Sequence, residues 1–362
     1  MNETMSLPLL GVRIARVSTV PFFVLTQLRH QLATLDAAGA AISVVCSEGP
    51  ELAELDGVRC EVIDIPRSIS LQYDLLAVWR LYHYFRRERI QIAHSTTPKA
   101  GLLTAIAAWL ARVPVRLHTY TGQPWLGMEG AKRWLVRNAE WLIGKLNTRC
   151  YTDSASQRSF LIEERIVCSK DSSVIGAGSL AGVDLRRFDP NRFSTEERGA
   201  LRSRLGIPLE APVLLFIGRI TAEKGVRELL QAFSSLRAAG SAAHLVFVGP
   251  FDDESGVSDT LTRADIEQLP AVRFTGYSDQ PESFLAIADL LCLPSYREGF
   301  GTVVIEAAAM GVPTVGSDIY GLSDAVVQGE TGLLVPPRDP VALGVALRRL
   351  LDDPRLRSTM GA

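Results

Sequence analysis

The stretch PSYREGFGTVVIEAAAMGVPTVGS, residues 294–317, decides the fold class of this chain. An apolar run ends at Pro294, a loop follows, and the segment 302–311 predicts a helix that Gly311 closes. β-branched residues resume at 313–317 as a further strand. A strand, a glycine-containing loop, a helix and another strand in this order are typical of a parallel sheet, whose ligands bind at the carboxyl ends of the strands.

The same stretch carries two acids and two glycines that suit a ligand. Gly299 and Gly301 allow the backbone to pass close to a bound molecule, and the helix that follows offers free N–H groups to an anion. Glu298 lies in the loop, whereas Glu306 lies among alanines on a helix expected to pack against the sheet. A carboxylate in that place is costly unless something hydrogen-bonds it. The alternative is that Glu298 is an ordinary residue of the turn and Glu306 an ordinary surface residue. The glycine spacing favours the hypothesis that both belong to a ligand-binding site.

A second signal is FIGRITAEKG, residues 216–225. Gly218 ends a predicted strand, Arg219 and Lys224 lie in the strand-to-helix turn, and Gly225 ends that turn. Two cations at the carboxyl end of a strand suit a diphosphate, because arginine binds bidentately and lysine acts as a point charge. A solvated basic turn is the alternative explanation, and the neighbouring glutamate segment argues against it.

Short β-branched runs alternate with helical stretches along the whole chain, the pattern of parallel sheets with crossover helices. In the first half, strands are predicted at 12–18, 41–46, 60–65, 90–94, 114–119 and 149–152. A polar linker with three prolines and one short helix spans 183–212. After it, strands are predicted at 213–218, 244–249, 272–276, 290–295 and 313–317. Two α/β domains are therefore expected, residues 1–190 and 191–362.

The stretch VIGAGSLAGVD, residues 174–184, resembles a dinucleotide-binding turn. Such a turn needs its glycines to lead straight into a helix that holds the pyrophosphate. Here Pro190 prevents a helix of useful length, and the stretch closes a domain rather than opening one. An interdomain turn is the better interpretation.

Composition excludes several classes of protein. With 47% hydrophobic residues, 22% charged residues and a formal net charge of −2, the chain has the balance of a soluble globular protein with no nucleic-acid partner. Five scattered cysteines indicate neither a disulfide framework nor a zinc site, which suits a reduced cytosol. No signal peptide is predicted, and the apolar segment 100–115 is too short to span a bilayer.

The segments GRITAEKG, VRFTGY, PSYREGFGTVVIEAAAMGVPTV and GLLVPPRDP, taken in order, resemble glycosyltransferase family 4, retaining enzymes of the GT-B fold. The segments 94–125 and GAGSLAGVD are similar to the capsule and O-antigen branch. The resemblance implies two Rossmann-like domains with parallel sheets that face each other across a cleft. It also implies a nucleotide-sugar donor, for which a UDP-sugar is expected, and a polyprenyl-diphosphate-linked sugar acceptor. No metal or cofactor is expected, because the protein's own cations replace it.

The resemblance also assigns roles to individual residues of the second domain. Arg219 and Lys224 are expected to hold the donor diphosphate and to stabilise the charge that develops on it. Glu306 is expected to bind the ribose hydroxyls. The remaining donor contacts are expected from Gly218, Gly276, Tyr277, Glu298, Gly299, Phe300 and Gly301.

The first domain departs from the family pattern at one position. Many relatives carry a histidine in a Thr-x-His pattern after the fifth strand, whereas this chain has Thr121 there, with His118 three residues earlier. His118 remains a candidate catalytic residue, and Gly122 and Gln123 are expected to line the acceptor side of the cleft. The family's long final helix is not expected in the chain's last segment, LDDPRLRSTMGA.

A basic, tryptophan-containing helix is predicted over 129–149. Trp134 and Trp141 lie within it among lysines and arginines, and Trp125 lies just upstream. Helices of this composition lie in the plane of a membrane surface, as a lipid-linked acceptor requires. A core-packing helix with a solvated basic face is the alternative.

These patterns together predict a retaining glycosyltransferase that transfers a hexose or N-acetylhexosamine during surface polysaccharide synthesis. Its expected location is the cytoplasm, at the inner face of the plasma membrane. Two alternatives remain open: a UDP-sugar epimerase of the same fold, and a catalytically inactive donor-binding partner subunit.

Overall fold

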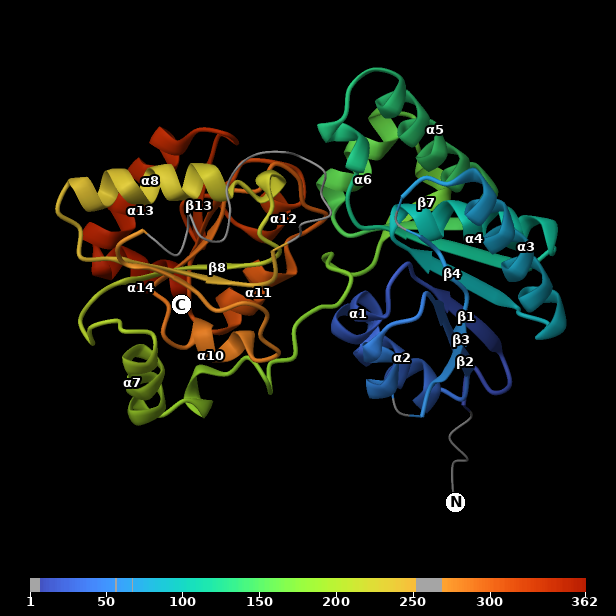
Figure 1. Ribbon diagram of the computed structural model, residues 1–362, viewed down its shortest axis with the longest axis horizontal. Helices are drawn as coiled ribbons and strands as arrows, with labels where there is room; N and C mark the ends of the chain where they lie inside the picture. The colour runs from blue at the N-terminus through green and yellow to red at the C-terminus, as the bar shows by residue number, and fades with distance from the viewer. Residues whose placement is uncertain (1–6, 56, 67, 252–268) are drawn as a thin grey trace. The chain divides into compact units, whose positions relative to one another are not determined.

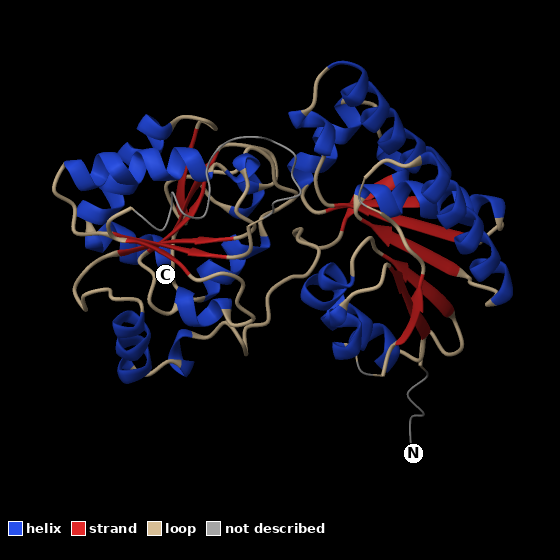
Figure 2. Ribbon diagram, viewed as in Figure 1, coloured by secondary structure: helices blue, strands red, loops and turns tan. Residues whose placement is uncertain are grey.

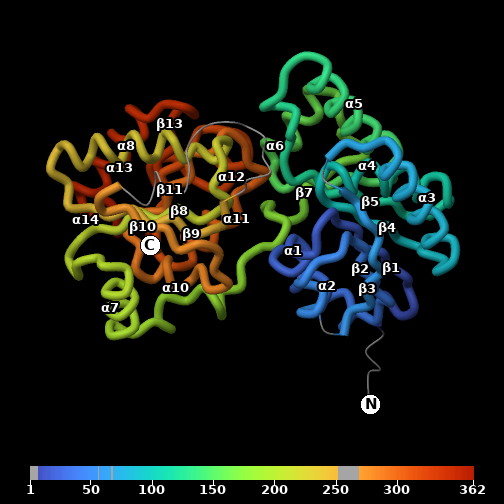
Figure 3. The backbone as a smooth tube through the Cα atoms, in the orientation of Figure 1, coloured from blue at the N-terminus to red at the C-terminus, as the bar shows by residue number. Residues whose placement is uncertain are grey.

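A computed structural model describes residues 7–55, 57–66, 68–251 and 269–362. The chain divides into two compact units, Met1–Ala181 and Gly182–Ala362 (Figures 1 and 3). The division falls a little before the boundary predicted at residue 190. Each unit is built around its own parallel sheet, which is the predicted α/β architecture (Figure 2).

The first unit contains a seven-stranded parallel sheet in the order β3-β2-β1-β4-β5-β6-β7. Its strands are β1 Arg13–Val17, β2 Ala41–Cys46, β3 Arg59–Val62, β4 Ile92–Thr96, β5 Val115–Tyr120, β6 Arg149–Thr152 and β7 Ser172–Val174. The six strands predicted for this half are all present. The edge strand β7 was not predicted, because it is three residues long and lies beside a glycine-rich stretch.

Helices cover this sheet on both faces. They are α1 Pro21–Phe23, η1 Val24–Leu28, α2 Arg29–Ala37, η2 Pro50–Glu54, α3 Leu71–Arg87, α4 Pro98–Leu110, η3 Pro124–Gly127, α5 Gly130–Leu146, α6 Ala155–Glu163 and η4 Ser169–Asp171. Val45 packs with residues of α3 and α4, whereas its neighbour Val44 packs with residues of η1 and α2. Because successive strand residues point to opposite faces, α3 and α4 cover one face and η1 and α2 the other.

The second unit contains a six-stranded parallel sheet in the order β10-β9-β8-β11-β12-β13. Its strands are β8 Val213–Ile217, β9 His244–Val248, β10 Val272–Phe274, β11 Leu290–Leu293, β12 Thr314–Ser317 and β13 Gly332–Val335. Its described helices are η5 Pro190–Arg192, α7 Thr195–Arg204, η6 Ala222–Lys224, α8 Val226–Ala238, α10 Pro281–Leu285, α11 Thr302–Ala309, α12 Leu322–Ala325, α13 Pro340–Asp352 and α14 Pro354–Gly361. The five predicted strands and the short linker helix are present, and β13 was missed.

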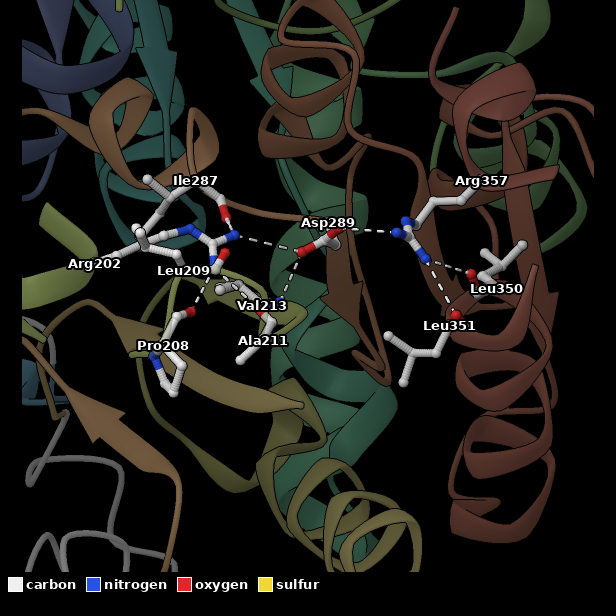
Figure 4. A network of polar contacts seen from close by, with 10 residues as sticks. All are labelled: Arg202, Pro208, Leu209, Ala211, Val213, Ile287, Asp289, Leu350, Leu351 and Arg357. Atoms are coloured by element: carbon white, nitrogen blue, oxygen red, sulfur yellow. Dashed lines mark hydrogen bonds and ion pairs between the residues drawn. The ribbon is translucent and has the colours of Figure 1, made fainter. Parts of the chain in front are cut away.

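The carboxylate of Asp289 links the central strands of this sheet to two of its helices (Figure 4). Asp289 lies immediately before β11 and accepts a hydrogen bond of 2.8 Å from the backbone N–H of Val213, at the start of β8. Arg202 of α7 and Arg357 of α14 lie 3.8 and 3.1 Å from its two oxygens. Asp289 therefore fixes the amino ends of β8 and β11, which leaves their carboxyl ends available for loops that carry function.

Both sheets reverse their strand order at one place. In the first unit, β1 has β2 on one side and β4 on the other; in the second unit, β8 lies between β9 and β11. The connections that leave the two central strands therefore diverge to opposite faces and open a crevice at the carboxyl edge. The loops after β1 and β4, and after β8 and β11, are the expected ligand sites.

A substitution at Gly225 tests how tightly the loops after β8 and β11 are packed. Its φ is +68°, and a Cβ there would lie 2.0 Å from the carbonyl oxygen of Pro294. Gly240, at the other end of α8, has φ +88° and nothing within 4 Å. Gly240→Ala should lower the free energy of unfolding by about 1–2 kcal/mol through backbone strain alone. Gly225→Ala should cost clearly more in the same urea titration, and equal costs would contradict the close packing.

Candidate active site

A lysine and a glutamate meet at the reversal point of the second sheet. Lys224, in the loop after β8, places its Nζ 2.5 Å from Oε1 of Glu298, in the loop after β11. Ser295 donates a hydrogen bond of 2.8 Å to the same oxygen. Both charged side chains are more than four-fifths buried, with 18% and 14% of their surface exposed. The structure thus brings together two predicted site residues that are far apart in the sequence.

The two loops also touch through their backbones. The N–H of Tyr296 donates to the carbonyl oxygen of Glu223 at 2.8 Å. Gly225 follows the short helix η6 in the left-handed conformation and lies against Pro294, as described above. These contacts orient Lys224 across the carboxyl edge of the sheet rather than into solvent.

Arg219 lies at the rim of this pair and is the more exposed cation. Its side chain is 48% exposed, and its Nη2 lies 3.6 Å from Oε1 of Glu223. The other oxygen of Glu223 accepts bonds of 2.6 and 3.0 Å from Arg297. Burial opposes ionisation of Glu223, but Arg297 and the nearby cations prevail and lower its pKa. Sequence reasoning missed Glu223 and Arg297, which lie next to predicted residues but gave no signal of their own.

Three glycines lie near Arg219, at the carboxyl ends of adjacent strands. Gly218, Gly249 and Gly276 follow the adjacent strands β8, β9 and β10 and all have positive φ. A Cβ on Gly249 would lie 1.9 Å from the carbonyl oxygen of Gly218, and the Gly249 N–H donates to Gly276 at 2.8 Å. Tyr277, beside Gly276, is 52% exposed. Gly249 was not predicted, although it ends a strand in the same way as Gly218.

Beyond Glu298, the loop after β11 presents backbone rather than side chains. Phe300 is 7% exposed, so its ring is buried and only its backbone can face a ligand. Gly301 has φ +81° and begins α11, and a Cβ there would lie 2.7 Å from Leu322. A Cβ on Gly321 would lie within 2.7 Å of the carbonyl oxygens of Glu298 and Gly299. Gly321, which sequence reasoning missed, therefore supports this loop from behind.

Glu306 lies on α11, partly buried and within the electrostatic reach of Arg187 and Glu282. Burial raises its pKa to about 7, Arg187 opposes the shift, and Glu282 adds to it. Arg187 and Glu282 form an ion pair of 2.8 Å. Glu306 is thus a carboxyl group whose environment leaves it poorly stabilised as an anion, as expected where a hydrogen-bonding partner is to be supplied from outside.

His118 has the surroundings of a core residue. It is 1% exposed, its Nδ1 lies 2.9 Å from the Ser95 hydroxyl, and a Cβ on Gly101 would lie 2.4 Å from its ring. Burial, with a smaller effect of the Arg16 charge, lowers the pKa of His118 to about 3. The ring is neutral and enclosed by α4, so its position gives its predicted catalytic role no support.

The other predicted residues of the first unit follow β5 directly. Thr121 and Gly122 are half-buried, whereas Gln123 is fully buried and accepts a long hydrogen bond of 3.4 Å from Gln157. Gln157 in turn accepts from the backbone N–H of Asp153 at 2.8 Å. Burial raises the pKa of Asp153 to about 8. Asp153, at the end of β6, was missed by sequence reasoning.

The three tryptophans on α5 or just before it differ in their exposure to solvent. Trp134 and Trp141 are 67% and 41% exposed. Trp125 is fully buried and donates a hydrogen bond of 2.7 Å to Glu140. Trp125 therefore anchors α5 to the unit, and of these three tryptophans only Trp134 and Trp141 are available for a surface interaction.

Within the described ranges, no group of three or more His, Cys, Asp or Glu side chains is placed to hold a metal ion. No helix in the part of the chain that the structure describes is long and apolar enough to cross a bilayer. The prediction that transfer needs no metal stays a prediction.

Two parallel α/β units, with a cationic, glycine-lined edge in the second, define a Rossmann-like protein of the GT-B class. The chain superimposes on HepE of Anabaena, in complex with UDP and glucose, with a TM-score of 0.79 and 18% identity over 97% of this chain and 93% of that one. A sucrose-phosphate synthase of Thermosynechococcus elongatus gives a TM-score of 0.75 at 23% identity, over 97% and 92% of the two chains.

Sequence comparison gives the family. Residues 197–362 match the model of glycosyl transferases group 1, and residues 24–171 match the glycosyl transferase 4-like domain. The chain is 30% identical to the capsular polysaccharide biosynthesis glycosyltransferase CapM of Staphylococcus aureus, over 92% of this chain and 86% of CapM. It is 35% identical to a glycogen synthase of Mycobacterium tuberculosis, over 90% and 81%. The chain therefore belongs to the group 1 glycosyl transferase family.

Glu306 should make stability depend on pH. Because its folded-state pKa is raised from 4.5 to about 7, its protonated form stabilises the fold at low pH, and that contribution is lost as pH rises through this window. Relative to Glu306→Gln, the wild-type protein should therefore lose melting temperature between about pH 5 and about pH 7.5. Glu330→Gln, at an exposed position of the same unit, is the control. Parallel curves for wild type and Glu306→Gln would contradict the assignment.

Proposed function

We propose that this chain transfers a hexose or N-acetylhexosamine from a UDP-sugar to a polyprenyl-diphosphate-linked sugar acceptor in surface polysaccharide synthesis. The observation that carries the proposal is the Lys224–Glu298 pair at the reversal point of the second sheet, with Arg219 at its rim. A cation held at the carboxyl edge, beside glycines that admit a close approach, suits the diphosphate of a nucleotide sugar.

In this proposal the second unit binds the donor. Arg219 and Lys224 bind the diphosphate, and the backbone at Gly299, Phe300 and Gly301 lies against the distal phosphate and the sugar. Glu306 accepts hydrogen bonds from the ribose hydroxyls, which supply hydrogen-bonding partners that the described residues do not provide. Glu298 contacts the sugar while it stays hydrogen-bonded to Ser295.

Transfer proceeds with retention of the anomeric configuration. The acceptor hydroxyl oxygen forms a bond to the anomeric carbon on the face from which the diphosphate leaves, as the bond between that carbon and the phosphate oxygen breaks. The hydroxyl proton passes to the departing phosphate. Fixed cations stabilise the charge that develops there, and this is the kind of electrostatic effect that dominates group transfer. The chain's own cations replace a metal in this scheme.

The choice of a lipid-linked acceptor rests on α5 and on the relatives. Trp134 and Trp141 are exposed on a helix that also exposes Lys132, Arg133 and Lys145. An exposed basic helix with tryptophans suits an anionic membrane surface, and a soluble glucan acceptor would not require one. CapM acts in capsular polysaccharide biosynthesis, and a 37% identical relative over 49% of this chain is described as a putative teichuronic acid biosynthesis glycosyltransferase. We place the protein at the inner face of the plasma membrane.

Donor binding is tested by thermal shift with UDP-, GDP- and dTDP-sugars. A UDP-sugar should raise the melting temperature of the wild-type protein, because a ligand that binds only the native state stabilises it. Arg219→Ala should weaken this ligand about 10–100-fold through loss of a charge-assisted hydrogen bond. Arg348→Ala, an exposed arginine of α13, is the control and should bind like wild type.

Two outcomes of that experiment would contradict the proposal. No shift with any nucleotide sugar would remove the donor site, and equal affinity of Arg219→Ala and wild type would move it elsewhere. Consumption of UDP-sugar without an acceptor, with release of an epimeric sugar nucleotide, would favour the epimerase alternative. Tight donor binding without turnover on any lipid-linked acceptor would favour the inactive partner subunit.

Membrane contact is tested by sedimentation with phosphatidylcholine vesicles that contain phosphatidylglycerol. The double variant Trp134→Ala/Trp141→Ala should bind roughly fivefold less, because it removes the apolar contribution of the helix but keeps its charge. Leu209→Ala/Val341→Ala, which removes two exposed apolar side chains of the second unit, should bind as wild type does. If the tryptophan variant sediments with vesicles as the wild-type protein does, α5 is not the membrane-binding element.

A further inference from the structure

The first unit contains a buried arginine whose guanidinium is largely unpaired. Arg16, on β1, is 1% exposed. Its Nη1 donates a hydrogen bond of 3.3 Å to the carbonyl oxygen of His94, on β4, whereas its Nε and Nη2 have no hydrogen-bond partner. A charged group that is removed from water without partners is costly, so this arrangement requires an explanation.

No carboxylate supplies one. Among the described residues, none of the acidic side chains forms an ion pair with Arg16, and burial alone lowers its pKa to about 9. The charge acts instead on two neutral histidines, His94 and His118, and helps to lower the pKa of each. The surroundings of Arg16 are therefore electropositive without a counter-charge.

Several polar residues share the face of the sheet on which Arg16 lies, although its register partner on β2, Val44, is apolar. Arg16 is paired in register with His94, and Thr96 with Thr119, so these four residues point to one face. The Nε2 of His94 lies 2.8 Å from the Thr119 hydroxyl, but the hydroxyl of Thr96 is fully buried and has no partner. The unsatisfied atoms are two N–H groups and one hydroxyl, and all three can donate hydrogen bonds.

These donors lie at the reversal point of the first sheet. Strands β1 and β4 end at Val17 and Thr96, within one residue of the cluster. The loops that follow are joined by a hydrogen bond of 2.8 Å between the hydroxyls of Thr19 and Thr97. Thr97 has φ +68°, a strained conformation for a β-branched residue, and such strain concentrates at functional sites.

We propose that Arg16 and Thr96 form a second oxyanion site, in the first unit, that binds a phosphoryl group of the acceptor's diphosphate. The assignment of the source rests on the proposed function, whereas the chemistry rests on the unsatisfied donors alone. An oxyanion supplies the acceptors that Arg16 Nε, Arg16 Nη2 and the Thr96 hydroxyl lack. The donor diphosphate, bound by Arg219 and Lys224, is the other possible source of a phosphoryl group.

The experiment uses the full chain with the donor cations removed. The triple variant Arg219→Ala/Lys224→Met/Glu298→Gln eliminates the phosphate site of the second unit without leaving a buried carboxylate unpaired. Inorganic pyrophosphate should still raise its melting temperature in a dose-dependent manner. Adding Arg16→Met should weaken that response at least tenfold, and adding Arg13→Met, at the exposed start of the same strand, should leave it unchanged.

The variant also separates a binding role from a structural one. Without ligand, Arg16→Met should melt at the wild-type temperature or above, because an uncompensated buried charge has been replaced by an apolar chain of similar length. If Arg16→Met does not fold, Thr96→Val takes its place and should weaken the pyrophosphate response. No response in the triple variant, or a response that survives both Arg16→Met and Thr96→Val, overturns the proposal.

Inhibition kinetics identify which substrate supplies the phosphoryl group that binds at Arg16. In the wild-type enzyme, pyrophosphate should inhibit transfer competitively against the lipid-diphosphate acceptor, even when UDP-sugar is saturating. Competition against the UDP-sugar alone would overturn the assignment to the acceptor. Failure of UDP-sugar binding in the wild-type protein, with the pyrophosphate response of the triple variant intact, would remove the proposed function and leave the anion site standing.

Discussion

The ion pair between Lys224 and Glu298 is the constraint on which the second unit's site depends. It joins the loops that follow β8 and β11, and the close packing of Gly225 and Gly321 allows those loops to approach. A buried pair of this kind adds little net stability, because desolvation offsets the attraction, but it fixes where the lysine stands. Under the proposed function, a diphosphate that reaches this edge meets a cation already in place, so little reorganisation is needed before transfer.

The two units share one strand topology, but a fully buried cation without a carboxylate partner is found only in the described residues of the first unit. Each sheet reverses its strand order beside its central strand and exposes two loops there. Lys224, a largely buried cation of the second unit, has a carboxylate partner, whereas Arg16, a fully buried cation of the first unit, has none among the described residues. A paired cation suits a ligand that takes the place of its carboxylate partner. A buried cation without a partner is stabilised when an anion binds to it. Both observations suit a protein that handles two phosphorylated substrates.

Much of the fold and the choice of candidate site residues could be predicted from the sequence, because the signals lie in short contiguous segments. The strands and the residues predicted for the donor site lie in contiguous motifs, in which the glycines and charges are visible directly. What could not be predicted depended on contacts between distant segments or on which face a side chain occupies. Arg187 comes to Glu306 from the linker, and Arg16 looks like any alternating residue of a strand. His118 and Trp125 looked functional by type, but both are enclosed in the core of the first unit.

A charge exchange at the central ion pair tests the account most directly. The double variant Lys224→Glu/Glu298→Lys restores an ion pair between the two loops but moves the cation to the opposite one. Calorimetric titration with UDP, alongside thermal melting, separates the two consequences. The account predicts that the exchange recovers most of the melting temperature lost in Lys224→Glu alone, while UDP binding stays abolished. UDP affinity equal to that of the wild-type protein would contradict the claim that the position of the Lys224 cation creates the donor site.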